Sequence, residues 1–78
     1  MKYKESDLME LYRVDKLYWE NGDTNLLDYM IDLAKRISNK NWSEVVSIVA
    51  LANRTGKSIG TVIDVLALYG FEIEQEDE

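Results

Sequence analysis

Apolar residues recur at helical spacing in four successive segments, and this pattern constrains the fold more than any other feature. Side chains that repeat every three or four residues are typical of helices that bury one face. The chain has no proline, and short polar breaks separate the segments. The sequence therefore predicts an all-α fold in which four short helices surround one core. We expect these helices over residues 7–20, from Asp23 or Thr24 to residue 37, between Asn41 and Gly56, and over residues 59–69.

Polar residues and glycines mark where these helices begin and end. Ser and Asn are favoured at the position before a helix, because their side chains accept hydrogen bonds from its first N–H groups. Glycine readily takes the left-handed conformation that ends a helix. The third segment is apolar on nearly all sides, so we expect it to be the central and most buried helix. The expected caps are Ser6, Asn41 and Ser58, and the expected stops are Gly22, Gly56 and Gly70.

The two ends of the chain differ from the helical middle. Residues 71–74 alternate between apolar and acidic, which predicts a short extended segment. Residues 75–78 continue it as an acidic tail, and we expect this tail and residues 1–5 to be frayed. A length of 78 residues suits one domain. We therefore expect residues 1–78 to form a single helical domain.

The composition bears on function mainly through what is missing. The chain has no Cys and no His. It therefore lacks the residue types of thiol nucleophiles and disulfides, the commonest general base and the commonest zinc ligand. We expect no enzyme, and no catalytic, cofactor-binding or metal-binding residues. No secretion signal or long apolar run is evident, so we expect a cytoplasmic protein with no membrane partner.

The stretch from residue 48 to residue 68 resembles a helix-turn-helix motif. A small residue stands at Ala52, a glycine at the bend at Gly56, and apolar residues follow at Val62 and Val65. A plain helical hairpin is the alternative interpretation. The triplet 56–58 also ends a phosphate-binding loop, but Leu51 stands where that motif needs its first glycine. Nucleotide binding is therefore disfavoured.

A second resemblance covers residues 50–74. Leu51-Ala52, Gly56, Ser58 and Gly70-Phe71 follow a rhythm similar to that of the small N-terminal module of bacterial translation initiation factor 2. The shared letters are mainly core and turn residues. This resemblance implies a shared helical shape, and a translation-linked role is a third functional hypothesis.

DNA binding is the alternative functional hypothesis. A helix-turn-helix regulator of transcription would be dimeric and would touch DNA through Arg54, Lys57, Ser58 and Thr61. The net charge of −6 opposes this role, because phosphate contacts require Lys and Arg. The expected outward positions of the last helix also lack base-reading side chains. These positions are Ser58, Ile59, Gly60, Ile63, Asp64 and Ala67.

Protein binding is the leading hypothesis. An acidic chain suits a host or cognate protein with a basic surface, because opposite charges speed association. The length, acidity and lack of catalytic groups resemble accessory proteins of phages and mobile elements that modulate another protein. A homodimer stays open. The first helix should display acidic side chains at Asp7, Glu10, Asp15 and Glu20. The candidate partner-binding residues are Trp19, Trp42, Asp28, Asp32, Glu72 and Glu74. A solvated acidic surface and tryptophans that close the core are the alternatives.

Overall fold

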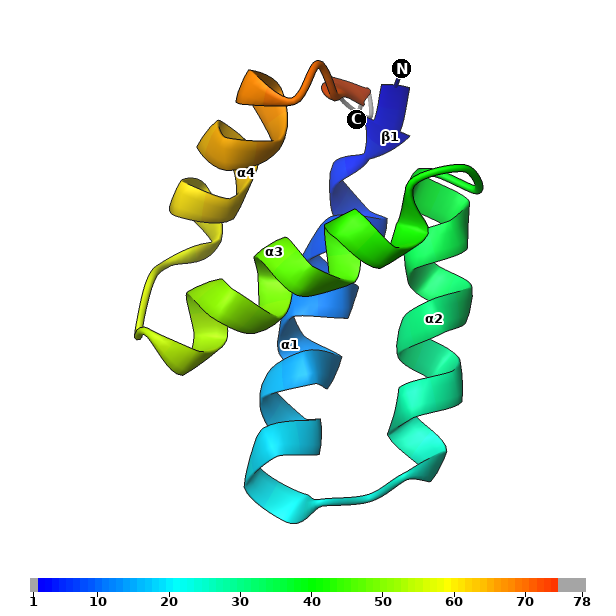
Figure 1. The fold of residues 1–78 in the computed structure, drawn as a ribbon, viewed down its shortest axis with the longest axis vertical. Coiled ribbons are helices and arrows are strands. Elements are labelled where there is room, and N and C mark those ends of the chain that lie inside the picture. The colour runs from blue at the N-terminus through cyan, green and yellow to red at the C-terminus, as the bar shows by residue number, and fades with distance from the viewer. Residues whose placement is uncertain (1, 75–78) are drawn as a thin grey trace.

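Four helices pack around one core in the computed structural model, which describes residues 2–74 (Figure 1). This arrangement confirms the predicted all-α class. The expected acidic tail of residues 75–78 lies outside the described residues. The elements follow in the order β1 (Lys2–Lys4), α1 (Glu5–Asn21), α2 (Asn25–Ile37), α3 (Trp42–Arg54), α4 (Ile59–Leu68) and β2 (Glu72–Glu74).

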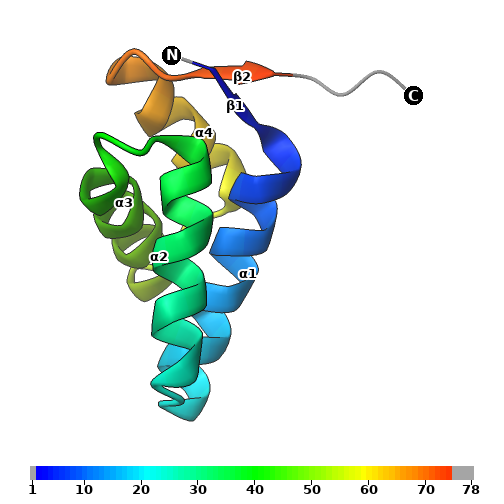
Figure 2. The same ribbon diagram turned by 90° about the vertical axis from the view of Figure 1, so that its right-hand side faces the viewer.

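Helices α1 and α2 form an antiparallel pair, and α3 crosses them (Figures 1 and 2). Gly22 ends α1 in the left-handed conformation, at φ 67°, and its N–H donates to the Tyr18 carbonyl over 2.8 Å. Thr24 is the N-cap of α2, and the Oδ1 of Asp23 accepts from the N–H of Asn25, the first residue of this helix, over 3.0 Å. The first predicted break is thus confirmed as a tight turn.

All four helices contribute apolar side chains to the same core. Each buried Leu, Val or Met side chain stabilises the fold by roughly 1.5–3 kcal/mol relative to exposure. Because the helices share these contacts, no helix buries its apolar face alone. The buried set comprises Leu8, Leu11 and Val14 of α1, Met30, Leu33, Ala34 and Ile37 of α2, Val45, Val49 and Ala52 of α3, Val62 and Leu66 of α4, and Tyr3 and Phe71.

Helix α3 is central but is not buried on all sides. It packs against α1, α2 and α4, as expected of a central helix. Leu51, however, is 61% exposed, and Ile48 is only partly buried. The expectation of burial nearly all round is therefore wrong for this side of α3. The physical reason is that the ten-residue α4 covers only part of the helix.

The structure confirms one of the three predicted helix caps and corrects the other two. Ser58 is confirmed, since its Oγ accepts from the N–H of Thr61 over 3.4 Å. Helix α1 begins earlier than Ser6, at Glu5, because strand β1 leads directly into it. Asn41 precedes α3, but its side chain makes no capping hydrogen bond within residues 2–74. Its backbone N–H instead donates to Ser38 Oγ over 3.1 Å.

A short parallel ribbon closes one end of the helical bundle (Figure 2). Lys2, Tyr3 and Lys4 of β1 pair with residues 72, 73 and 74 of β2. Tyr3 is buried beside Phe71, with ring centroids 6.2 Å apart in an edge-on arrangement. The extended segment predicted at residues 71–74 is confirmed. The fraying predicted for residues 1–5 is wrong for residues 2–5, because burial of Tyr3 anchors the strand.

Candidate functional site: a groove between α3 and α4

The turn of residues 55–58 joins α3 to α4 and fixes how the two helices diverge. Gly56 adopts the left-handed conformation, at φ 71°. The N–H of Lys57 donates to the carbonyl of Ala52 over 2.7 Å. The carbonyl of Lys57 accepts from the Tyr12 hydroxyl, also over 2.7 Å, and this bond ties the turn to α1. The predicted glycine bend is therefore present and is held from both sides.

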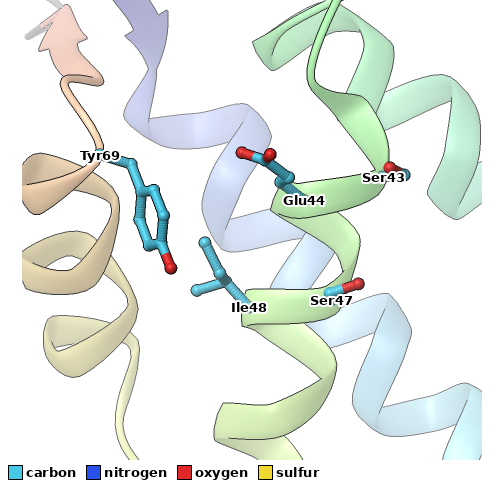
Figure 3. Close-up of a pocket in the computed structure, with 5 residues that line it drawn as sticks. All are labelled: Ser43, Glu44, Ser47, Ile48 and Tyr69. Atoms are coloured by element: carbon cyan, nitrogen blue, oxygen red, sulfur yellow. The ribbon is translucent and has the colours of Figure 1, made fainter.

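A largely apolar groove runs between the two helices. Its lower part is a cavity of about 340 Å³ that Leu51 and Val65 help to line, with Lys57 at the turn. Its upper part is a cavity of about 240 Å³ beside Glu44 (Figure 3). Ile48 and Tyr69 line both cavities, so the two form one continuous depression. We call this depression the α3–α4 groove.

The groove is bordered by apolar side chains that water reaches freely. Leu51 is 61% exposed, Tyr69 63% and Leu68 86%. Among residues 2–74, these are the most exposed of the large apolar side chains. Leu68 lines neither cavity and lies one helical turn beyond Asp64, toward the outward side of α4, so Leu51 and Tyr69 are the exposed apolar residues that border the groove. An apolar border of this kind is typical of a binding surface.

Opposite charges lie at the two ends of the α3–α4 groove. Glu44 borders the upper cavity and Lys57 borders the lower one. In the described part of the chain, neither side chain takes part in an ion pair. The stretch of α3 from Glu44 to its end at Arg54 is about 15 Å long at 1.5 Å per residue. The groove therefore has a polarity along its length.

The two tryptophans proposed as partner-binding residues lie far apart. The Arg54 guanidinium lies over the Trp19 ring, 5.3 Å from its centroid, and Trp19 is half exposed. Trp42 packs against the core, with the Lys35 ammonium 5.5 Å from its ring centroid. Trp42 and Arg54 are the first and last residues of α3, about 18 Å apart along the helix. The two rings therefore cannot act as one anchor pair.

The acidic partner-binding candidates are also dispersed. Asp28 and Asp32 are exposed on α2, and Asp32 pairs with Arg36 at 3.5 Å. Glu72 is exposed on β2, opposite Lys2 in the ribbon. Glu74 ends the same strand, opposite Lys4. Figure 2 places this ribbon and the α1–α2 turn at opposite ends of the molecule. The structure therefore does not gather the six candidates into one patch.

The DNA-binding candidates have local roles in the structure. Ser58 caps α4, Thr61 lines the α3–α4 groove, and Arg54 stacks on Trp19. Ile59 and Ile63 were expected to point outward, but both pack against the core. Burial of these apolar side chains stabilises the fold, so they face the core and not the solvent. The outward face of α4 instead carries Gly60, Asp64 and Ala67.

Sequence reasoning missed a buried polar pair between α1 and α3. Asp15 was expected on the acidic surface, but it is 1% exposed. The Nδ2 of Asn53 donates to Asp15 Oδ2 over 2.8 Å and to the carbonyl of Tyr12 over 3.1 Å. Burial raises the pKa of Asp15, and the hydrogen bond from Asn53 opposes this rise. The spacing from Leu8 and Leu11 would have placed Asp15 on the buried face.

In residues 2–74, carboxylates, Cys and His do not gather into a metal-binding group. The helices of this region are too short or too polar to cross a membrane. No family model matches the sequence, and no curated protein or solved structure matches it. The two resemblances drawn from the sequence therefore stay predictions.

Proposed function

We propose that this chain is a small interaction protein that binds and modulates another protein through the α3–α4 groove. The exposure of Leu51 and Tyr69, which line this groove, carries the proposal. Each Å² of apolar surface removed from water contributes roughly 25 cal/mol to binding before the costs of association. In this proposal the chain acts in the cytoplasm by binding, without catalysis.

The charge of the chain supports a partner with a basic surface. The net charge of −6 steers such a partner toward the chain. Asp28 and Glu72 are exposed away from the groove and contribute to this long-range field. The apolar groove then supplies the short-range contact. The role of an accessory protein of a phage or mobile element belongs to the same proposal and rests on the small size and acidity of the chain.

The outward face of α4 favours a protein partner over DNA. Gly60 and Ala67 have no side chain that can read a base edge, and Asp64 repels phosphate. Arg54 and Lys57 lie near the turn, but two cations supply few phosphate contacts. The helix-turn-helix regulator is therefore the weaker candidate. Retention of duplex DNA at low salt, with a steep loss as salt rises, would favour that regulator over the proposal.

Site-specific photo-crosslinking tests the proposed contact face. A photo-crosslinking amino acid replaces Leu51 in one sample and Leu27, an exposed apolar residue of α2, in the control. In lysate of the source cells we expect the groove position to yield an adduct with another protein. The added substitution Tyr69→Asp should remove this adduct, because Tyr69 lines both cavities. Equal labelling from both positions, or survival of the adduct in Tyr69→Asp, would contradict the proposal.

A further inference from the structure

We infer that the α3–α4 groove also pairs two copies of this chain across a two-fold axis. This inference rests on the proposed function, because it names one occupant of the proposed contact face. It also adds a regulation, since self-pairing and binding of another protein would compete for the same groove.

The shape of this face is suited to self-pairing. A two-fold interface brings the same patch of both copies together, so the patch must complement itself. Leu51 is 61% exposed, lines the lower cavity and lies along the groove between Glu44 and Lys57. One face therefore carries both an exposed apolar side chain and a cavity. In a symmetric pair, each copy places its Leu51 against the groove of the other.

The charges of the groove complement themselves in one orientation only. A two-fold axis perpendicular to the groove reverses its direction in the second copy. Glu44 of one copy then faces Lys57 of the second copy, and the same pair forms again at the other end. A parallel arrangement would instead bring like charges together. The polarity of the groove therefore selects the antiparallel pair.

The size of the face indicates a weak dimer. A typical stable interface buries about 800 Å² on each partner, which is roughly 15% of the 5188 Å² accessible surface here. A face two short helices wide falls at or below this size. The acidic net charge adds repulsion, which salt screens beyond about 8 Å at physiological ionic strength. We therefore expect a dimer that dissociates on dilution and that leaves the groove available to another protein.

Sedimentation equilibrium of the purified full chain tests self-pairing. The mass should rise from 9.1 kDa toward twice that value between about 10 µM and 1 mM. Leu51→Asp should keep the chain monomeric at the highest concentration. The control Leu27→Asp adds the same charge on α2 and should leave the mass curve unchanged. A constant mass of 9.1 kDa up to 1 mM, or equal effects of the two variants, would overturn the inference.

A charge swap tests the antiparallel orientation. Glu44→Lys and Lys57→Glu should each weaken the dimer at least threefold. The double variant should restore at least half of the lost affinity, because the two ion pairs form again with reversed sign. Circular dichroism melts of all three variants show whether each remains folded. Additive weakening in a folded double variant would overturn the antiparallel pair.

Crosslinking separates failure of this inference from failure of the proposed function. Self-pairing predicts a Leu51-position adduct of two chains, whereas binding of another protein predicts an adduct of different mass. A monomer at all concentrations that still gives the second adduct would overturn self-pairing and leave the proposed function standing. Absence of both adducts would overturn both.

Discussion

The side-chain amide of Asn53 donates a hydrogen bond of 2.8 Å to the buried carboxylate of Asp15, and this bond joins α3 to α1. The same amide also donates to the carbonyl of Tyr12 over 3.1 Å. Within residues 2–74 the other carboxylate oxygen, Oδ1, is buried and has no hydrogen-bond partner. A single amide of α3 therefore serves two acceptors on α1.

Replacement of that amide should destabilise the fold. Asn53→Ala leaves the Asp15 carboxylate buried without its donor, and such a loss costs about 1–3 kcal/mol. Urea unfolding at pH 7 measures the change in the free energy of unfolding. The control Asn39→Ala removes an exposed amide and should change this free energy by less than about 0.5 kcal/mol. Equal effects of the two substitutions would show that the amide bond contributes nothing.

Burial of Asp15 should make the stability fall as pH rises. Burial raises its pKa in the folded chain above the unfolded value of about 3.9. The folded state then binds the proton more tightly, so this contribution is complete below pH 3.9 and is lost as pH rises through the folded pKa. Asp15→Asn cannot titrate. The free energy of unfolding of this variant, minus that of the parent, should therefore increase with pH.

The prediction concerns the difference in the free energy of unfolding between Asp15→Asn and the parent, because other carboxyl groups change the stability of both proteins in the opposite direction with pH. The hydrogen bond from Arg13 lowers the pKa of Glu10, so the contribution of Glu10 grows as pH rises. Glu10 is present in both proteins and cancels in the difference. Asp28→Asn, which changes an exposed carboxylate, is the matched control and should give a flatter difference. A difference for Asp15→Asn that stays constant or decreases with pH would contradict the prediction.

Local sequence patterns predicted the helices, whereas contacts between segments distant in the sequence were not predicted. Apolar spacing, the bend at Gly56 and the cap at Ser58 each depend on neighbouring residues. The β1–β2 ribbon joins strands of three residues from opposite ends of the chain, and so short a strand has no readable periodicity. The exposure of Leu51 depends on how far α4 reaches along α3, and this is a property of packing.

The candidate site was predicted less well than the fold. The six partner-binding candidates were chosen for charge and aromaticity, but those properties do not say which residues become neighbours. The α3–α4 groove instead depends on Ile48 and Tyr69, which were not among the candidate site residues. A strongly apolar third segment gave a partial signal, because α3 has more apolar surface than its neighbours cover.

Replacement by alanine should change the stability of the fold in opposite directions at two glycines. Gly56→Ala places a Cβ on a residue at φ 71° and should cost about 1–2 kcal/mol, because L-residues disfavour this conformation. Gly60 lies inside α4, where an added Cβ would meet Ser58 Oγ at an ordinary 3.5 Å. Gly60→Ala should therefore stabilise the fold by about 0.5–1 kcal/mol. Thermal melts of both variants measure the signs, and shifts in the same direction would contradict this account.

The stability that the β1–β2 ribbon contributes should come from the ring of Tyr3 and not from its hydroxyl. Tyr3→Ala removes a buried ring that packs edge-on against Phe71, and such a loss costs about 3–5 kcal/mol. The Tyr3 hydroxyl is buried without a hydrogen-bond partner in the described part of the chain. Tyr3→Phe keeps the ring and removes this unpaired group, so the variant should be at least as stable as the parent. Urea unfolding of the two variants separates the contributions. A loss of more than about 1 kcal/mol in Tyr3→Phe would contradict this account, because it would show that the hydroxyl makes a stabilising hydrogen bond.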